Sequence, residues 1–92
     1  MGYMKQQRLS PEYMAEVGNR IKLIRIYLKY DQKQLSKYLQ TTQSQLSKVE
    51  AGKCEMPLYL LLRVKKLADT DEYLRENLTW SWLLEGKGKG VF

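Results

Sequence analysis

Residues 32–52, QKQLSKYLQTTQSQLSKVEAG, decide the fold. The segment has the pattern of two short amphipathic helices joined by a tight turn. Asp31 and Thr42 are candidate N-caps, because a short side-chain oxygen can accept a hydrogen bond from an N–H of the first helical turn. Gly52 closes the segment as a residue that tolerates the left-handed conformation after a helix end. The inward faces are predicted from apolar residues at helical spacing: Leu35 and Leu39, then Leu46 and Val49.

The outward face of the second helix is polar. It consists of Gln43, Ser44, Ser47 and Lys48. By itself such a face is usually just solvated, but it can also lie against a hydrogen-bonding surface such as the edges of base pairs. The turn before this helix is so short that one residue needs a positive φ, and we expect this residue to be Gln40.

Towards the N-terminus, Ser10-Pro11-Glu12 is a strong helix start, and residues 1–9 before it are predicted to be a flexible tail. This helix should end near Tyr30. Gly18 either marks a close contact within it or is its true beginning. The inner face is predicted from spacings of three and four: Met14, Val17, Ile21, Ile24 and Leu28.

Towards the C-terminus, Pro57 begins a further helix. We expect it to bury Leu58, Leu61 and Leu62, with Leu67 or Ala68, and to expose Arg63, Lys65 and Lys66. Two short helical stretches follow at 71–76 and 80–85, the second capped by Thr79 and closed by Gly86. Residues 87–92 are rich in glycine and are predicted to be a flexible tail. The prediction is one all-α domain, residues 10–86, of about five helices.

The composition narrows the function classes. A chain of 92 residues with 43% hydrophobic and 28% charged residues is predicted to form one globular domain. It has no apolar run long enough to span a bilayer and no signal-peptide pattern, and with one cysteine we expect a cytoplasmic location. With no histidine and one cysteine, neither a metal site nor a cofactor is expected, and an enzyme is the weakest class.

The net charge of +6 is concentrated in one part of the chain. Residues 17–53 hold eight basic and two acidic residues, whereas the segments before and after them are neutral. Such an excess can simply aid solubility. Its position on the first three helices favours a polyanionic partner. The basic residues are Arg20, Lys22, Arg25, Lys29, Lys33, Lys37, Lys48 and Lys53.

An ordered set of residues carries a family resemblance. Arg25, Gln32, Leu35, Thr-Thr-Gln at 41–43, Leu46, Val-Glu-Ala-Gly-Lys at 49–53, Pro57 and Trp-Leu-Leu-Glu-Gly-Lys-Gly at 82–88 follow one another along the chain. This pattern resembles the helix-turn-helix domain of the phage repressor and Cro-type (Xre-type) regulators. The resemblance implies a compact, lambda-repressor-like domain of five helices. The chain departs from the family at Gln40, where glycine is usual, and at Ser36, where alanine is usual.

The resemblance also assigns roles. It makes residues 42–51 a recognition helix in the major groove, with base contacts from Gln43, Ser44, Ser47 and Lys48. Arg25 and Glu50 match a structural ion pair between helices. The implied phosphate contacts are Gln32, Lys33, Thr42, Lys37, Lys53 and Arg25. The lysines among them contact either phosphate or open solvent.

The implied function is a sequence-specific DNA-binding transcriptional regulator, and we expect it to be a repressor. The expected partner is double-stranded DNA that contains a palindromic operator, and a homodimer is expected to bind it. When bound to DNA, the protein would be found at the nucleoid. The alternative is an antitoxin-type protein that binds a partner toxin as well as its operator. Five aromatic residues expected to be exposed serve either a protein partner or a dimer interface: Tyr59, Tyr73, Trp80, Trp82 and Phe92.

Overall fold

Six helices make up the part of the chain that the computed structural model describes, residues 10–88 and 90–92, and this part contains no strand. The prediction of an all-α fold is confirmed, but the expected number of five helices is wrong. The predicted tail at residues 1–9 lies outside the described residues. The helices are α1 (Pro11–Tyr27), α2 (Gln32–Tyr38), α3 (Gln43–Glu50), α4 (Leu58–Ala68), α5 (Glu72–Asn77) and α6 (Trp80–Glu85).

The two stretches predicted at 71–76 and 80–85 form separate helices, α5 and α6, because the chain is extended between them. Leu78 has ψ 117° and Thr79 has φ −112° and ψ 160°, so no helical hydrogen bonding continues from one helix to the next. The Thr79 hydroxyl then accepts from the Trp82 N–H at 3.1 Å and starts α6 anew. Ser10, Asp31 and Thr42 cap α1, α2 and α3 in the same way, so all four predicted N-caps are confirmed.

The first three helices end in the same hydrogen-bonded motif. In each, the residue after the C-cap is left-handed: Lys29 at φ 65°, Gln40 at φ 55° and Gly52 at φ 71°. The N–H of the following residue then donates to the carbonyl five residues earlier, as from Tyr30 to Arg25 at 3.1 Å. The positive φ predicted for Gln40 is confirmed. The helix predicted to end near Tyr30 ends at Tyr27, because Lys29 adopts the left-handed conformation.

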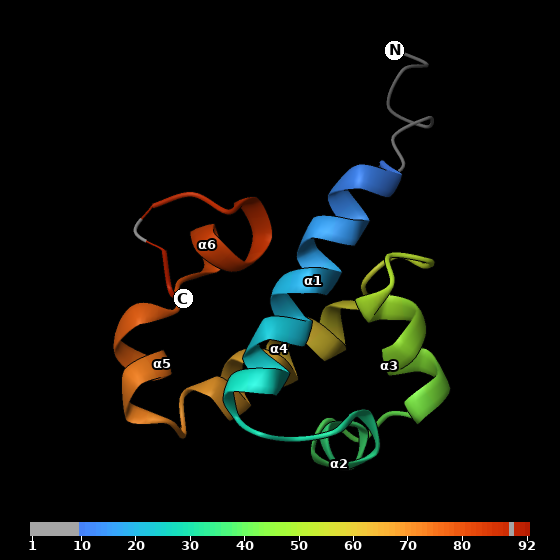
Figure 1. The fold of residues 1–92 in the computed structure, drawn as a ribbon, viewed down its shortest axis with the longest axis horizontal. Coiled ribbons are helices and arrows are strands. Elements are labelled where there is room, and N and C mark those ends of the chain that lie inside the picture. The colour runs from blue at the N-terminus through green and yellow to red at the C-terminus, as the bar shows by residue number, and fades with distance from the viewer. Residues whose placement is uncertain (1–9, 89) are drawn as a thin grey trace.

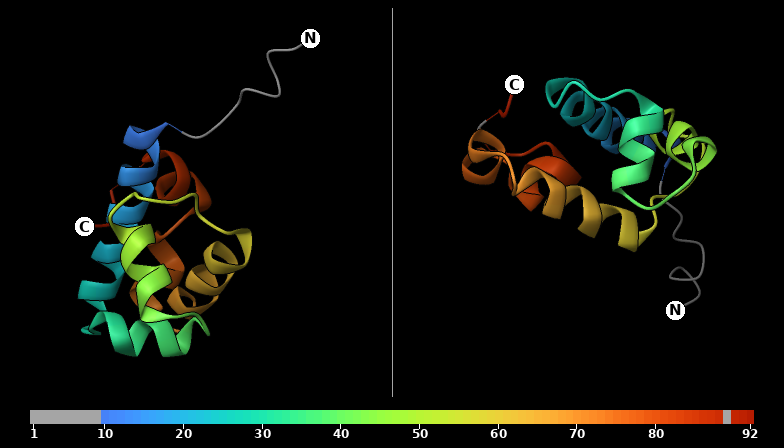
Figure 2. Two further views of the ribbon diagram at one scale, coloured as in Figure 1. Left: turned by 90° about the vertical axis from the view of Figure 1, so that its right-hand side faces the viewer. Right: turned by 90° about the horizontal axis from the view of Figure 1, so that it is seen from below.

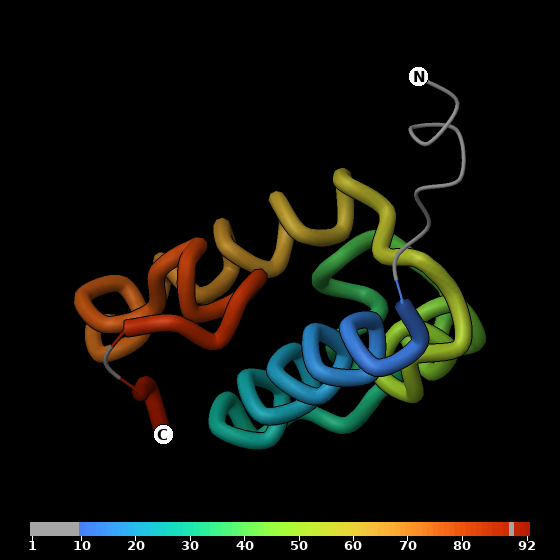
Figure 3. Tube along the Cα trace, turned by 90° about the horizontal axis from the view of Figure 1, so that it is seen from above, coloured from blue at the N-terminus to red at the C-terminus, as the bar shows by residue number. Residues whose placement is uncertain are grey.

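Helix α1 runs through the middle of the molecule, with α2 and α3 on one side of it and α5 and α6 on the other (Figure 1). Seen from above, α4 extends along the length of the domain and links these two sides (Figure 3). The turned views show α4 on the opposite side of the domain from α1 (Figure 2). The most completely buried side chains come from α1 to α4 and from the two short helices: Ile21, Ile24, Leu35, Leu46, Leu60, Leu74 and Leu83.

The buried face of α4 differs from the prediction. Leu58 is 70% exposed and Leu62 is 52% exposed, whereas Leu60, Val64 and Ala68 are buried. The reason is that residues 58–62 read Leu-Tyr-Leu-Leu-Leu, a run in which every face is apolar. Spacing in such a run does not define an inner face, so tertiary packing selects it.

The end of the chain packs against the domain. Val91 is buried with 2% exposure, and its carbonyl accepts a hydrogen bond from the Tyr73 hydroxyl. The Phe92 ring lies 5.6 Å from the ring of Tyr27 and 5.8 Å from that of Trp82, between ring centroids. The last two residues of the predicted tail at 87–92 thus have packing partners in the domain, and the flexibility of this segment stays a prediction. Trp82, expected to be exposed, is buried.

Candidate functional site

The polar face of α3 is the most conspicuous candidate site. The side chains of Gln43, Ser44, Ser47 and Lys48 are all exposed, while Leu46 and Val49 on the opposite face are buried. The structure thus brings together on one helix the four residues predicted to contact bases. Thr42 lies at the start of this helix, where its hydroxyl oxygen accepts from the Gln45 N–H at 3.0 Å.

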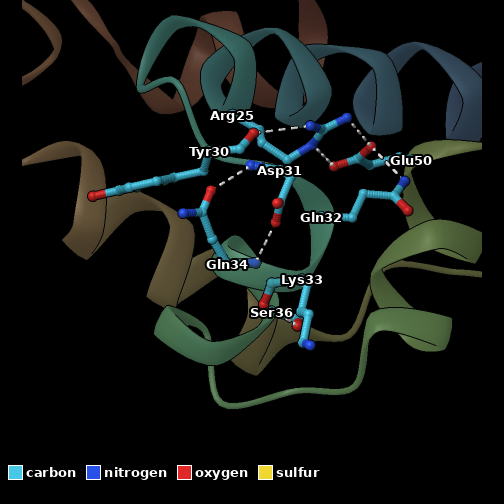
Figure 4. Close-up of polar contacts among 8 residues, drawn as sticks. All are labelled: Arg25, Tyr30, Asp31, Gln32, Lys33, Gln34, Ser36 and Glu50. Carbon is cyan, nitrogen blue, oxygen red and sulfur yellow. Dashed lines mark hydrogen bonds and ion pairs between the residues drawn. The ribbon is translucent and has the colours of Figure 1, made fainter.

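A buried carboxylate holds the C-terminal end of α3. Glu50 accepts two hydrogen bonds from the Arg25 guanidinium, from Nε at 2.8 Å and from Nη2 at 3.1 Å. Gln32 Nε2 donates to the same carboxylate at 3.0 Å (Figure 4). The Glu50 side chain is only 3% exposed and that of Arg25 only 13%. A bidentate pair with a third donor fixes α3 to α1 and to the start of α2 with defined geometry.

Two of the predicted phosphate ligands, Arg25 and Gln32, therefore have internal partners. Arg25 also donates from Nη1 to the Tyr30 carbonyl at 3.0 Å. A guanidinium has five N–H donors and an amide nitrogen has two, so both side chains retain donors beyond these hydrogen bonds. Sequence reasoning placed Gln32 at phosphate and missed its contact with Glu50. A phosphate contact by either residue stays a prediction.

Exposed lysines lie on each of the first three helices and in the residues that follow α1 and α3. Lys33, Lys37 and Lys53 are exposed, and Lys33 points away from the Glu50 carboxylate (Figure 4). Lys22, Lys29 and Lys48 are also exposed, and none of the six belongs to an ion pair within the described residues. In contrast, both arginines of residues 17–53 make internal contacts. The excess positive charge of the first three helices is therefore carried by solvent-facing ammonium groups.

Close backbone contacts seat α3 on α1. A Cβ at Gly18 would overlap the carbonyl oxygen of Val49, and one at Gly52 would lie 2.7 Å from the Cα of Ala15. Gly18 lies inside α1, which begins at Pro11. Of the two roles predicted for Gly18, close packing is therefore the correct one.

The turn between α2 and α3 accommodates both departures from the family pattern. Gln40 adopts the left-handed conformation in place of glycine, at a cost of about 1 kcal/mol. Ser36 is buried, and its hydroxyl donates to the Lys33 carbonyl at 2.8 Å, so no polar group is left unpaired there. Arg63 of α4 reaches this turn, although the sequence placed it on an exposed face. Its partners are more than 20 residues away in sequence, and no local pattern identifies them.

Next to α2, the rings of Tyr30 and Tyr38 stack with 4.8 Å between their centroids. The hydroxyl of Tyr38 and, to a lesser extent, burial raise the pKa of Tyr30 above its ordinary value. The raised pKa keeps the Tyr30 ring neutral at physiological pH. The two stacked rings lie beside Lys37, the neighbour of Tyr38 in α2.

Other kinds of site have little support. Within residues 10–88 and 90–92, no three potential metal ligands lie close enough together to hold an ion. No helix in these ranges has the length and apolarity needed to cross a membrane. An apolar cavity of about 70 Å³ lies between α1, α4 and α6, and Cys54 and Met56 are among its lining residues.

Comparison with models of known protein families gives a match over most of the chain. A family model described as a helix-turn-helix domain matches residues 18–89, more than three quarters of the chain. The match includes both helices α2 and α3 and the turn between them. No curated protein and no solved structure matches.

Proposed function

The chain belongs to the helix-turn-helix domain family, and on that premise we propose that it is a sequence-specific DNA-binding regulator of transcription. The observation that carries the proposal is the exposed polar face of α3, held at its C-terminal end by the Glu50 carboxylate and accompanied by exposed lysines on α2 and just after α3. A surface of this kind matches DNA in two respects. It has short hydrogen-bonding side chains for base edges and positive charge for phosphates.

In this proposal α3 lies in the major groove and reads bases with its exposed polar face. The Gln43 amide can pair with N6 and N7 of adenine, and Lys48 can donate to O6 and N7 of guanine. Ser44 and Ser47 are short enough to let the backbone approach the bases while still donating hydrogen bonds. These four residues determine which sequence is bound.

Affinity that does not depend on sequence comes from phosphate contacts. Lys33, Lys37 and Lys53 are exposed on or next to α2 and α3 and supply ammonium groups. Thr42, at the N-terminus of α3, and the spare donors of Gln32 and Arg25 complete the set. Phosphate contacts of this kind fix the register of a protein on the duplex without reading bases.

We further propose a phage repressor and Cro-type (Xre-type) mode of action. A homodimer occupies a palindromic operator with half-sites about one helical turn apart, and it represses by blocking polymerase. The resemblance of Arg25, Gln32, Glu50 and the segment around them supports this type. Two half-sites also allow modest contacts from each protomer to add up to specific binding.

A second candidate function is that of an antitoxin-type protein, which binds a protein partner in addition to its operator. Exposed aromatic rings favour it: Phe92 is 56% exposed and Tyr73 42%, and both pack against the ring of Tyr27. Apolar residues grouped on a surface often mark a protein interface. The same residues serve equally well as a dimer interface. The two candidate functions therefore differ in what covers these residues: a different protein for the antitoxin type, or a second copy of this chain for the dimeric regulator.

Selection of binding sites from random duplex DNA at two salt concentrations tests the proposal. The purified 92-residue chain should enrich a palindrome, and the spacing of its halves gives the dimer geometry. Binding that is salt-sensitive but enriches no motif would contradict sequence-specific regulation. A defined complex with the product of a neighbouring gene, formed alongside DNA binding, would favour the antitoxin-type function.

A further inference from the structure

The turn between α2 and α3 carries backbone strain. Gln40 has φ 55°, in a position where glycine is the residue without strain. The Thr41 N–H donates to the Ser36 carbonyl at 2.9 Å, and Thr42 then caps α3. Because only Thr41 and Thr42 separate Gln40 from α3, the dihedral angles of Gln40 set the direction in which α3 begins.

One side chain from a distant helix supports this turn. Arg63 of α4 donates from Nη1 to the Leu39 carbonyl at 3.0 Å and to the Gln40 carbonyl at 3.3 Å. Its guanidinium lies over the ring of Tyr59, 4.8 Å from the centroid. The Tyr59 hydroxyl in turn lies 3.4 Å from the Thr41 hydroxyl oxygen. Arg63 and Tyr59 thus contact the turn at three consecutive residues.

The chemistry of arginine suits this place. The C-terminal carbonyls of a helix lack intrahelical partners and carry partial negative charge, so a cation there is favourable. The planar guanidinium stacks on the Tyr59 ring while its edge donates to the two carbonyls. Lysine has the same charge but offers neither the planar stack nor a rigid edge, so it is a poor substitute.

The two ends of α3 are therefore held by different groups. At the C-terminal end, the Glu50 carboxylate binds Arg25 and Gln32. At the N-terminal end, where Gln43 and Ser44 lie, the turn is held by Arg63. We propose that Arg63 is a positioning residue for sequence recognition, which holds the strained Gln40 turn so that Gln43 and Ser44 meet base edges correctly. This inference rests on the proposed DNA-binding function.

Two simpler roles for Arg63 predict different behaviour. If it were only a phosphate ligand, its loss would weaken binding to every duplex and reduce the salt dependence. If it only stabilised the fold, its loss would lower the active fraction and affect all duplexes equally. A positioning residue instead changes the ratio of affinities for the selected motif and for unrelated DNA.

The test compares Arg63→Ala, Arg63→Lys, Gln40→Gly and the Arg63→Ala/Gln40→Gly double variant. The matched control is Lys66→Ala, which removes the same charge from an exposed position one turn further along α4. Each protein is titrated with the selected duplex and with a scrambled duplex. Arg63→Ala should lower the affinity ratio roughly tenfold, as expected for weakened base contacts, and Arg63→Lys should lower it nearly as much.

Gln40→Gly should rescue the loss. Glycine adopts the left-handed conformation without strain, so the turn no longer needs the arginine, and the double variant should regain most of the affinity ratio. Lys66→Ala should leave the ratio unchanged. An unchanged ratio in Arg63→Ala, or a double variant as poor as Arg63→Ala, would overturn the inference.

Failure of the proposed function has a separate signature, namely that the unaltered chain itself does not discriminate between duplexes. The effect of Arg63 on the turn is then measured by amide hydrogen exchange at Gln40 and Thr41. Arg63→Ala should accelerate exchange there, and Gln40→Gly should reverse this. If the exchange rates of the Gln40 and Thr41 amides were the same in the unaltered protein and in Arg63→Ala, Arg63 would not stabilise the turn.

Discussion

Helices α2 and α3 and the C-terminal segment from α5 onward are attached to α1 by contrasting kinds of contact. Directional polar groups and close backbone packing hold α3: Glu50 binds Arg25 and Gln32, and Gly18 admits the Val49 carbonyl. Aromatic rings hold the C-terminal segment, together with single hydrogen bonds from Arg20 to the Leu83 carbonyl and from the Tyr27 hydroxyl to Asp71. Tyr27 of α1 contacts Tyr73 and Phe92, with ring centroids 5.9 and 5.6 Å apart.

The difference follows from what each region exposes. A helix whose outer face is polar and open to a partner buries only its inner side, so its orientation depends on a few geometrically defined contacts. Ring contacts have broad energy minima and leave part of each ring exposed. We therefore expect substitutions at the α3 contacts to cost more stability than those among the rings, and to alter recognition.

The largest effect is expected from Glu50→Ala. The Glu50 side chain is only 3% exposed in the unaltered protein. Its removal leaves the Arg25 guanidinium and the Gln32 amide without their shared acceptor. Breaking a buried ion pair in this way should cost about 3–5 kcal/mol of unfolding free energy, measured by urea denaturation. Glu50→Gln is the control, since it retains an acceptor and should lose less. A loss below about 1 kcal/mol for the alanine variant would show that the pair does not hold α3.

A smaller loss is expected from Gly18→Ala. The added methyl group meets backbone rather than a flexible side chain, so α3 must shift. Overpacking of this kind costs about 1–3 kcal/mol, partly offset by the better helix propensity of alanine, about 1 kcal/mol. Asn19→Ala, at an exposed position of the same helix, is the matched control and should be near neutral. If Gly18→Ala were as stable as this control, the close contact between α1 and α3 would be in doubt.

The smallest effect is expected from Phe92→Ala in the C-terminal segment. It removes ring contacts with Tyr27 and Trp82, but Phe92 is already 56% exposed. The loss should be about 1 kcal/mol in thermal or urea unfolding, with DNA sequence preference unchanged. Leu58→Ala is the control for simple loss of apolar surface area, because the Leu58 side chain on α4 is 70% exposed. A changed sequence preference in Phe92→Ala would remove the distinction between the two regions.

The contacts that could be predicted from sequence are local ones. Ser10, Asp31, Thr42 and Thr79 each cap a helix through an N–H three residues away, and Gln40 takes a positive φ because the turn is short. Capping and turn geometry depend on a few adjacent residues, so a single sequence contains the information. The polar face of α3 was predicted for the same reason.

The features that were missed depend on tertiary contacts. The inner face of α4 is ambiguous in an apolar run, and only packing selects Leu60 and Val64 over Leu58 and Leu62. The hydrogen bonds of Arg63 and the burial of Val91 join residues far apart in sequence. Nothing local distinguishes an arginine that binds carbonyls from one in solvent. The contact of Gln32 with Glu50 was missed for the same reason, because the two residues are 18 positions apart in sequence.

The proposal that α3 reads DNA is tested most directly by comparing Gln43→Ala with Lys33→Ala. Both proteins are titrated with the selected motif and its single-base variants over a range of salt concentrations. Gln43→Ala should abolish discrimination at one position of each half-site, worth about 1–3 kcal/mol, and keep the salt dependence. Lys33→Ala should weaken all duplexes alike and reduce the salt slope by about 1. Equal losses on every duplex for Gln43→Ala, with discrimination intact, would contradict base reading by α3.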